Sequence, residues 1–319
     1  MDILLIANPR SAAATPLGPA ARAALGRCGA VHEVTTLGAG DDVARIAAAL
    51  AQPCDAVVAA GGDGTVRAVS AALMQVAARP PLAILALGTA NNVARSLGFP
   101  SVRQVGAAAI EATCRALAGR QSRSLDLGRA DGEWFVGSFA LGMDAAILAA
   151  RNRWRARWRL GPRLGGYPLY LASCAANLAV HRGVATRLTV DGATRAAPLY
   201  NLLVANTALY AGEFRFDADD RSGDGLLDLH EFASAGAYVR GFVTAWRRHL
   251  AYERGASVVA PPLQRVRSVV IESDVALRSQ LDGEEGPSAT SFTVEVVPGA
   301  LLALSPQRHN GTTTAVVSL

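Results

Sequence analysis

The sequence predicts a two-part α/β plus β protein: an N-terminal α/β domain with glycine-rich strand-to-helix turns, followed by a mainly antiparallel β-rich domain. Three observations carry this prediction. The first hundred or so residues alternate apolar, strand-like runs with segments of helical periodicity. Two of these strands run directly into glycine-rich turns. From about Leu125 the chain reads instead as strands joined by short turns, and the length of 319 residues suits two domains.

Composition narrows the class of protein. Apolar residues make up 51% of the chain, which is enough to bury a core and argues against disorder. No apolar run approaches the roughly 18 residues of a transmembrane helix. The first nine residues resemble a buried strand more than a signal peptide. The four cysteines show no CxxC spacing, so we expect reduced core thiols in a cytoplasmic protein.

The first elements are predicted in chain order as β–α units. Ile3–Ala7 forms a strand and runs into a turn at Asn8. Residues 31–36 form a second strand, and Gly40 precedes a helix with Val43, Ile46 and Leu50 on one face. The apolar runs 56–59 and 82–87 form two further strands, which are predicted to be parallel and buried.

Each of those last two strands leads into a glycine-rich turn, Gly61-Gly62-Asp63-Gly64-Thr65 and Gly88-Thr89-Ala90-Asn91-Asn92. Such turns open beside each other at the carboxyl edge of a parallel sheet, where open α/β sheets bind ligands. Glycine allows backbone N–H groups to approach an anion, and helix N-termini add positive charge, so phosphate is the expected ligand. The Asp63 carboxylate suits a divalent cation that accompanies phosphates. One such motif alone could be only a tight turn, and the matched second motif argues against that alternative.

Later elements complete the expected fold. A helix is predicted around residues 104–119, and Asp191-Gly192 predicts a hairpin between strand 186–190 and the apolar run 199–205. Residues 301–304 form a last strand, and the tail from Gln307 has little periodicity and is expected to be peripheral.

The two glycine turns, together with the run LGTANNVARSLGFP at 87–100, resemble the diacylglycerol kinase catalytic domain family, which includes sphingosine kinases and bacterial lipid kinases. The resemblance extends from about Asn8 to Pro306. GGDGT alone also occurs in NAD kinases and phosphofructokinases, whereas the combination is more specific. The resemblance implies an ATP-binding α/β domain at 1–128, completed by a returning strand within 301–319, and a lipid-substrate domain at 129–300.

The resemblance also implies which residues bind ATP. They are Asn8, Thr36, Gly61, Gly62, Asp63, Gly64, Thr65, Gly88, Thr89 and Asn91. Two positions depart from the family pattern. Ala12 stands where glycine is usual, which puts a close approach of the backbone to phosphate in doubt. Asn92 stands where aspartate is usual, and its amide cannot contribute charge toward a metal.

Asp282-Gly283-Glu284 resembles the family's Asp-Gly-Glu motif, whose glutamate acts as the general base. The chemistry requires such a group, because a hydroxyl that attacks a γ-phosphate must lose its proton. The resemblance therefore makes Glu284 and Asp63 the catalytic candidates. Glu285 is adjacent but does not occupy the motif position. Without the resemblance, the same three residues would read as an ordinary surface turn.

The acidic stretch 217–228 suggests an EF-hand but does not match one. Arg221 and Ser222 stand where that loop needs an acid or amide and then glycine. Residues 224–228 instead resemble the family's Asp-Gly-x-Leu-Asp stretch. The resemblance implies a structural Mg²⁺ bound by Asp224, with backbone carbonyls near Arg221 and Leu226. The alternative is a solvated acidic turn.

Residues Arg151–Arg163 are the most polarised segment, with six arginines, no acid, and Trp154 and Trp158 one helical turn apart. This pattern suits an anionic bilayer surface. At roughly 1 kcal/mol per basic residue, a few of these arginines could recruit the protein to the inner face of the membrane. A solvated basic helix with its tryptophans packed inward is the alternative. No nucleic-acid module is recognisable, so we expect no nucleic-acid partner despite the net charge of +5.

The combined prediction is an ATP- and Mg²⁺-dependent lipid kinase with a diacylglycerol-like or sphingoid-like acceptor and a role in phospholipid metabolism. An NAD kinase-like enzyme is the alternative within the same reaction class. A non-catalytic nucleotide- or lipid-binding protein is the alternative outside it, motivated by Ala12 and Asn92. The five histidines are isolated, which gives no support to a zinc site or a Ser-His-Asp triad. The identity of the lipid, and whether the protein forms a homo-oligomer, are left open.

Overall fold

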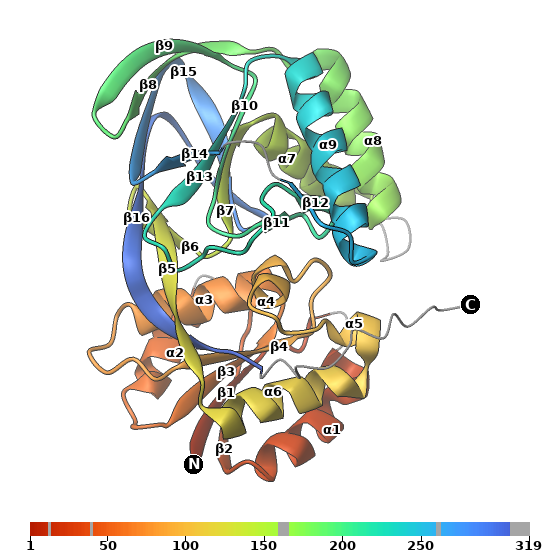
Figure 1. The fold of residues 1–319 in the computed structure, drawn as a ribbon, viewed down its shortest axis with the longest axis vertical. Helices are drawn as coiled ribbons and strands as arrows, with labels where there is room; N and C mark the ends of the chain where they lie inside the picture. Colours follow the sequence, from red (N-terminus) through yellow and green to blue (C-terminus); the bar gives the residue numbers. More distant parts are fainter. Residues whose placement is uncertain (12–13, 39–40, 159–165, 260–262, 307–319) are drawn as a thin grey trace.

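The N-terminal part is built on four parallel strands. A computed structural model describes residues 1–11, 14–38, 41–158, 166–259 and 263–306. The parallel strands lie in the order β2-β1-β3-β4 (Figure 1). β3 and β4 are buried along their whole length, as expected for strands covered on both faces. The strands of this part are β1 Asp2–Ala7, β2 Ala30–Thr35, β3 Ala56–Gly61 and β4 Leu82–Ala86. Its helices are α1 Ala14–Gly26, α2 Asp42–Leu50, α3 Asp63–Leu73, α4 Asn92–Ser96, α5 Val102–Val105 and α6 Ala107–Gly119.

Two long strands, β5 Ser122–Ala130 and β16 Glu284–Leu304, run from one part of the molecule to the other (Figure 1). They pair with each other over most of the length of β5. The end of β16 reaches the parallel strands, where Ala303 lies opposite Leu82 of β4. The expected domain boundaries at residues 128 and 300 therefore fall inside continuous strands and not in flexible linkers.

The second part is an antiparallel extension of the same sheet. Its main strands follow β16 in the order β15-β7-β10-β13-β14, and β8 pairs with both β15 and β9. Asp191 and Gly192 form the expected hairpin turn, with φ values of 46° and 88°. The expected partner strand is wrong, because the hairpin joins β8 to residues 193–199, and residues 201–205 form a separate strand that pairs with β7 and β13. The strands are β6 Glu133–Phe135, β7 Ser138–Gly142, β8 Val184–Val190, β9 Ala193–Leu199, β10 Asn201–Ala205, β11 Leu209–Tyr210, β12 Phe214–Arg215, β13 Leu227–Phe232, β14 Gln264–Val266 and β15 Ser268–Leu281.

Three helices interrupt the strands of the second part: α7 Met143–Trp158, α8 Tyr167–Val180 and α9 Ala235–Glu253. The second part is mainly antiparallel β as expected, but strands joined by short turns do not account for α8 and α9. The helical spacing of Trp154 and Trp158 agrees with α7. α8 contains no charged residue, so it shows no polar face from which a helix could be recognised. α9 does carry helical signals. Ser234 caps its first turn, and Tyr238, Phe242 and Ala245 are buried at helical spacing.

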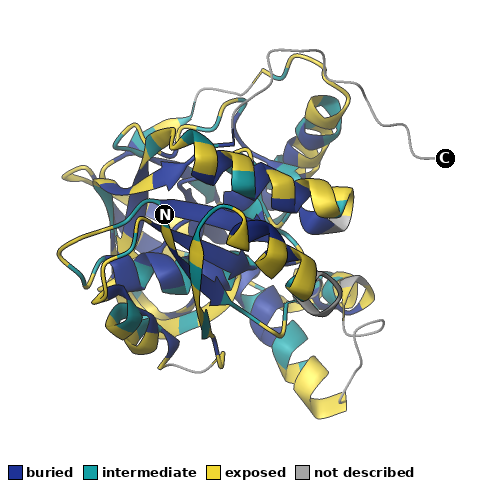
Figure 2. Cartoon of the chain, turned by 90° about the horizontal axis from the view of Figure 1, so that it is seen from below, coloured by how far each residue is buried: buried dark blue, intermediate teal, exposed yellow. Residues whose placement is uncertain are grey.

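The core follows this division into layers. One cluster of buried side chains covers the parallel strands and the ends of β5 and β16, a second fills the antiparallel sheet, and a third lies under α7 and α9. Figure 2 shows buried strands enclosed by helices whose inner faces are buried and whose outer faces are exposed. The four cysteines are free and partly buried. Within the described ranges, no helix is long and apolar enough to cross a bilayer.

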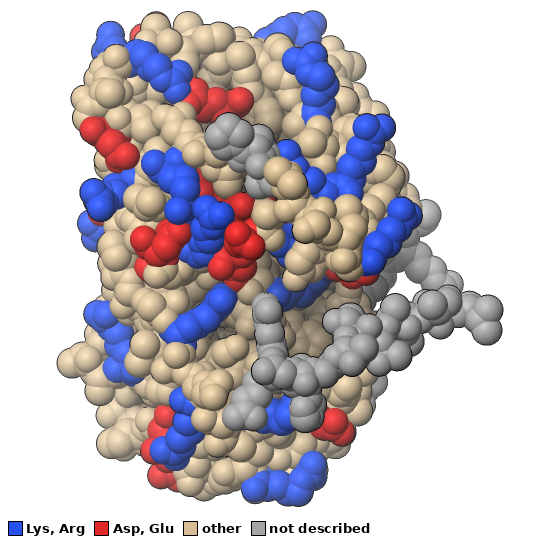
Figure 3. Space-filling view, viewed as in Figure 1, with Lys and Arg blue, Asp and Glu red and all other residues tan. Residues whose placement is uncertain are grey.

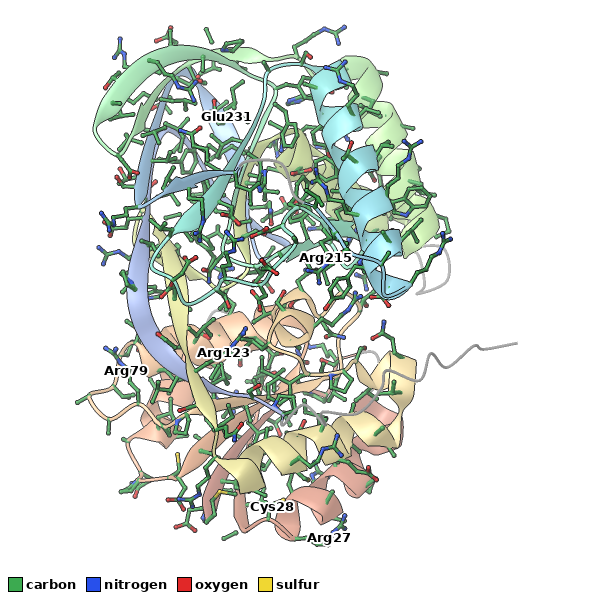
Figure 4. The ribbon with its side chains drawn as sticks, in the orientation of Figure 1. Arg27, Cys28, Arg79, Arg123, Arg215 and Glu231 are labelled. Carbon is green, nitrogen blue, oxygen red and sulfur yellow. The ribbon has the colours of Figure 1, made fainter. Side chains whose placement is uncertain are left out.

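Arginine side chains tie the two parts together near the junction. Arg123 of β5 donates to Asp220 (2.6 Å) and to the Ser96 carbonyl. Arg95 of α4 donates to the Gly212 carbonyl (2.7 Å) and to Glu253 (2.9 Å). Figure 4 labels Arg123 in the N-terminal half of the ribbon and Arg215 in the other half. These contacts hold α4 against the β11–β12 turn and the end of α9.

His230 of β13 makes the stability of the fold dependent on pH. Its ring lies 4.7 Å from that of Phe216, and burial lowers the pKa of His230 from 6.5 to about 4. A histidine held neutral in this way adds stability above pH 6.5 that is lost as the pH falls through about 4. The gap between these two pKa values corresponds to about 3 kcal/mol. We expect His230→Phe to lose correspondingly less stability than the wild type between pH 7 and pH 4.5, as measured by urea unfolding. Replacement of the exposed His32 by Gln is the control, and an equal loss in His230→Phe would contradict the assignment.

Candidate active site

A cleft of about 1660 Å³ lies between the two parts of the molecule. Its walls include the two glycine turns, α7 from Asp144 to Arg155, the β11–β12 turn and the turn that joins β15 to β16. Drug-sized ligand pockets are usually about 300–1,000 Å³. The cleft therefore has room for a nucleotide and a second substrate together.

The first glycine turn joins β3 to α3 and is tightly packed. A Cβ on Gly61 would lie 2.2 Å from Thr65 Oγ1, so only glycine fits there while Thr65 keeps its place. The Thr65 hydroxyl accepts a hydrogen bond from Asn8 Nδ2 (3.1 Å), which connects this turn to the end of β1. Thr36 is buried, with its backbone N–H bonded to the Ala7 carbonyl, and also lines the cleft.

The second glycine turn packs directly on the first. A Cβ on Gly88 would lie 2.4 Å from Gly62 Cα and 2.7 Å from Asn91 Oδ1. Asn91 closes the turn from inside: its Oδ1 accepts from Gly88 N–H, and its Nδ2 donates to the Gly88 carbonyl and to Ser101 Oγ. Asn91 is only 1% exposed and adopts a left-handed conformation, with φ 51°.

Asp63 links the two turns. Its carboxylate accepts hydrogen bonds from the backbone N–H groups of Asn92 and Val93, each at 3.1 Å, at the start of α4. Burial raises the pKa of Asp63, and these backbone donors act in the opposite direction. The Asn92 side chain connects α4 to the β11–β12 turn, because its Oδ1 accepts a hydrogen bond from Gly212 N–H (2.7 Å). Asp63 thus caps the neighbouring helix and also lines the cleft.

The Asp282-Gly283-Glu284 turn closes the opposite side of the cleft. The Asp282 carboxylate accepts the backbone N–H groups of Val136, Gly137 and Ser138 at 2.7–2.9 Å. Burial raises the pKa of Asp282 to about 6 in spite of these donors. Asp282 and Gly283 both have positive φ, so the turn reverses the chain sharply between β15 and β16. Asp282 is therefore the anchor of the turn, and Glu284 is the residue presented to the cleft.

Glu284 lies over the first glycine turn, although the two are far apart in the sequence. A Cβ on Gly64 would lie 2.5 Å from Glu284 Oε1. Its other carboxylate oxygen, Oε2, pairs with Arg67 Nη1 at 3.2 Å. The neighbouring Glu285 instead accepts from Asn152 Nδ2 (2.7 Å) on α7. Two carboxylates that are adjacent in sequence therefore have different surroundings, and Glu284 is the one beside the glycine turn.

Most of the residues expected to bind the nucleotide line this cleft, namely Asn8, Thr36, Gly62, Asp63, Gly64, Thr65, Gly88 and Thr89. Gly61 and Asn91 do not line it and support the turns from behind. Ala12 lies outside the described residues. Sequence reasoning assigned no site role to Arg67 or to the buried Asp144, which lines the cleft and accepts from Tyr238 Oη (2.6 Å) and Asn201 Nδ2 (2.9 Å). Arg67 follows the GGDGT motif by two residues, and Asp144 lies in the run 142–145, which resembles a Gly-x-Asp-Ala turn of the family.

The expected structural cation site lies away from the cleft. Asp224 Oδ2 pairs with Arg265, which sits opposite Asp228 on the neighbouring strand, and Asp224 Oδ1 accepts from Leu226 N–H (3.1 Å). The Arg221 carbonyl accepts from Gly223 and Asp224 N–H groups. Arg265 therefore supplies the positive charge beside Asp224 in this structure, and the Mg²⁺ site at Asp224 with the Arg221 and Leu226 carbonyls stays a prediction. Across the part of the chain that the structure describes, no three acidic, histidine or cysteine side chains are grouped as a metal site.

Comparisons with known proteins agree with this architecture. Residues 2–130 match the family model described as the diacylglycerol kinase catalytic domain, and residues 137–305 match the YegS C-terminal NAD kinase beta sandwich-like domain. A curated relative named "Probable lipid kinase YegS-like" from Chromohalobacter salexigens is 30% identical over 316 residues, covering 96% of this chain and 94% of that protein. A diacylglycerol kinase of Mycobacterium tuberculosis is 29% identical over 274 residues, covering 83% of this chain and 81% of that protein.

Solved structures share the fold. The crystal structure of a diacylglycerol kinase from Bacillus anthracis superimposes with a TM-score of 0.67 at 20% identity, covering 99% of this chain and 98% of that one. The mixed α/β N-terminal part and the β-rich second part are therefore confirmed. With both halves matched by their family models and a 30%-identical relative aligned over nearly its whole length, this chain belongs to the diacylglycerol kinase and YegS-like lipid kinase family.

Proposed function

We propose that the protein is an ATP- and Mg²⁺-dependent lipid kinase that transfers the γ-phosphate to a lipid hydroxyl, with Glu284 as the general base. The observation that carries this proposal is the position of Glu284, whose Oε1 lies directly over Gly64 in the first glycine turn. A carboxylate at this place can reach a hydroxyl that attacks a phosphate held by the turn.

The glycine turns supply the phosphate site. Gly62, which precedes α3, packs against Gly88 of the second turn. The N-terminus of α3 therefore opens beside the backbone of both turns, and helix N-termini favour bound anions. A bound Mg²⁺ would neutralise part of the phosphate charge. Such an ion is usually held by one or two protein carboxylates together with the phosphate oxygens of the substrate. Asp63 lines the cleft and is the carboxylate nearest the meeting point of the two turns. Its hydrogen bonds to α4 leave its carboxylate oriented by the neighbouring turn.

In the proposed reaction, the hydroxyl oxygen of the lipid displaces ADP from the γ-phosphorus. Glu284 accepts the hydroxyl proton as the lipid oxygen bonds to the γ-phosphorus, and the bond from that phosphorus to the bridging oxygen breaks to release ADP. Phosphoryl transfer of this kind depends chiefly on positioning and charge stabilisation. We place the acceptor beside Asp144, Ile147 and Leu148 of α7, which line the cleft from the second part of the molecule.

The proposal is tested by incubating the protein with γ-labelled ATP, Mg²⁺ and a panel of lipid alcohols in mixed micelles. A labelled lipid that forms with the wild type and not with Glu284→Gln would support the kinase and identify its acceptor. Turnover of NAD in place of lipid would favour the NAD kinase-like alternative, to which the description of the second family model also points. ATP binding without any labelled product would favour the non-catalytic alternative.

The basic end of α7 is the surface we propose for contact with an anionic membrane. Trp154 and Trp158 stack with ring centroids 5.6 Å apart, and Trp158 remains 54% exposed. Arg153, Arg155 and Arg157 are exposed beside them, whereas residues 159–163 lie outside the described residues. Figure 3 shows further basic side chains over the neighbouring α8–α9 side of the molecule, where acidic ones are sparse.

We expect the wild type to sediment with vesicles that contain anionic lipid and much less with zwitterionic ones. Combined replacement of Arg153, Arg155 and Arg157 by Gln should lower vesicle binding by about tenfold or more, at roughly 1 kcal/mol for each lost basic residue. The same replacement of Arg22, Arg27 and Arg45, three exposed arginines of the N-terminal part, is the matched control. Equal sedimentation of both triple variants would show that α7 is not the docking surface.

A further inference from the structure

Arg67 makes three separate contacts across the cleft. It lies on α3, and its side chain is only 17% exposed. Its Nε donates to the Trp134 carbonyl (2.8 Å), its Nη2 pairs with Glu133 (3.2 Å), and its Nη1 pairs with Glu284 Oε2 (3.2 Å). The guanidinium group therefore connects the helix that follows the first glycine turn with β6 and with the start of β16.

The contact with the Trp134 carbonyl orients the guanidinium group. A planar guanidinium with Nε bonded to a backbone oxygen of a paired strand presents its remaining N–H groups in a defined direction. Glu284, in contrast, is 59% exposed and has no comparable packing of its own. A long, exposed carboxylate samples several rotamers unless a fixed partner selects one. Arg67 is that partner.

We propose that Arg67 is a positioning residue that holds the Glu284 carboxylate over Gly64, in the orientation needed to accept the proton of the acceptor hydroxyl. Arg67 occupies Oε2 and directs Oε1 toward the glycine turn. This inference rests on the proposed function, because it takes Glu284 as the base. Its Nε, Nη1 and Nη2 each contact a protein group, and the contact of Nη1 is with Glu284.

The test is a double-mutant cycle on the full chain, with ATP and the lipid acceptor identified by the labelling assay. Arg67→Gln should lower kcat by about 10- to 100-fold, the loss expected when a catalytic group is misplaced by about 1 Å. KM for ATP should stay within about twofold of the wild type, because uniform nucleotide binding is not affected. Arg67→Lys should recover part of the loss, since a lysine reaches the carboxylate but cannot keep the Trp134 contact at the same time.

The decisive arm is Arg67→Gln in the Glu284→Gln background. Residues that act as one unit give non-additive losses, so the double variant should be no more than about twofold slower than Glu284→Gln alone. Arg115→Gln, an exposed arginine on α6, is the matched control for loss of one arginine and should leave kcat unchanged. Thermal melting of each variant separates loss of fold from loss of positioning.

The outcomes distinguish the two proposals. If Glu284→Gln is as active as the wild type, the base assignment fails and the inference about Arg67 fails with it. If Glu284→Gln is slowed by the expected factor but retains a measurable rate, and Arg67→Gln lowers kcat by the same factor in both backgrounds, only the inference about Arg67 is overturned. A rise in KM for ATP of tenfold or more in Arg67→Gln would likewise overturn it, because the arginine would then contact the nucleotide.

Discussion

Replacement of Glu284 by glutamine is expected to lower kcat by on the order of 10²–10⁴ while nucleotide binding remains nearly intact. Glutamine keeps the size of the side chain and a hydrogen bond to Arg67, but it cannot accept a proton from the attacking hydroxyl. Glu284 lies over Gly64, at the edge of the phosphate site, and does not hold the turns together. Its replacement should therefore slow the chemical step and leave the structure of the two glycine turns unchanged.

The measurement pairs single-turnover phosphate transfer with ATP binding by equilibrium titration. Glu285→Gln is the matched control, because Glu285 is adjacent in sequence, is also exposed, and contacts Asn152 in place of the glycine turn. We expect Glu285→Gln to retain most of the wild-type rate. Transfer by Glu284→Gln at the wild-type rate would show that another group accepts the proton.

Gly88→Ala is expected to have the second large effect. A Cβ at this position would lie 2.4 Å from Gly62 Cα, which is backbone and has no side-chain freedom through which it could move aside. The two turns must then separate, which shifts their backbone and the start of α3 away from the positions proposed to hold phosphate. A shift of about 1 Å in bound phosphates can lower kcat/KM by on the order of 10². Overpacking of this kind also costs about 1–3 kcal/mol of stability.

The matched control for this change is Gly26→Ala at the end of α1, where an added Cβ meets nothing within 4 Å. Isothermal titration with an ATP analogue and thermal melting should show weaker binding and a lower midpoint for Gly88→Ala only. Unchanged ATP affinity in Gly88→Ala would mean that the contact between the two turns does not shape the phosphate site.

Local features of the fold could be predicted because each depends on neighbouring residues. Glycines after the buried runs that became β3 and β4 predicted both turns, and Asp191-Gly192 predicted a hairpin whose φ values are indeed positive. α8 could not be recognised in this way, because its charge-free sequence gives the same apolar signal as buried strands. α9 could have been recognised from its cap at Ser234 and from the spacing of its buried residues.

The candidate site depended on contacts that no local pattern contains. Arg67 and Glu284 are 217 residues apart, and Asp282 meets its three backbone donors at a separation of about 145 residues. The motifs identified Glu284 as a candidate, but only the folded chain shows which neighbours orient it. Asp63 illustrates the same limit, since its hydrogen bonds go to the start of α4 in the neighbouring turn and could not be deduced from its type.

The path of β16 has a consequence for the order in which this protein folds. The parallel strands of the N-terminal part are complete only when residues 301–304 lie beside β4, some 220 residues later in the chain. During synthesis, the edge of β4 therefore stays without its partner until almost all described residues have been made. Long-range pairing of this kind is slow and leaves an exposed strand edge in the meantime. The two halves should consequently acquire their final stability together, and the newly made N-terminal half depends on the last strand for protection against aggregation.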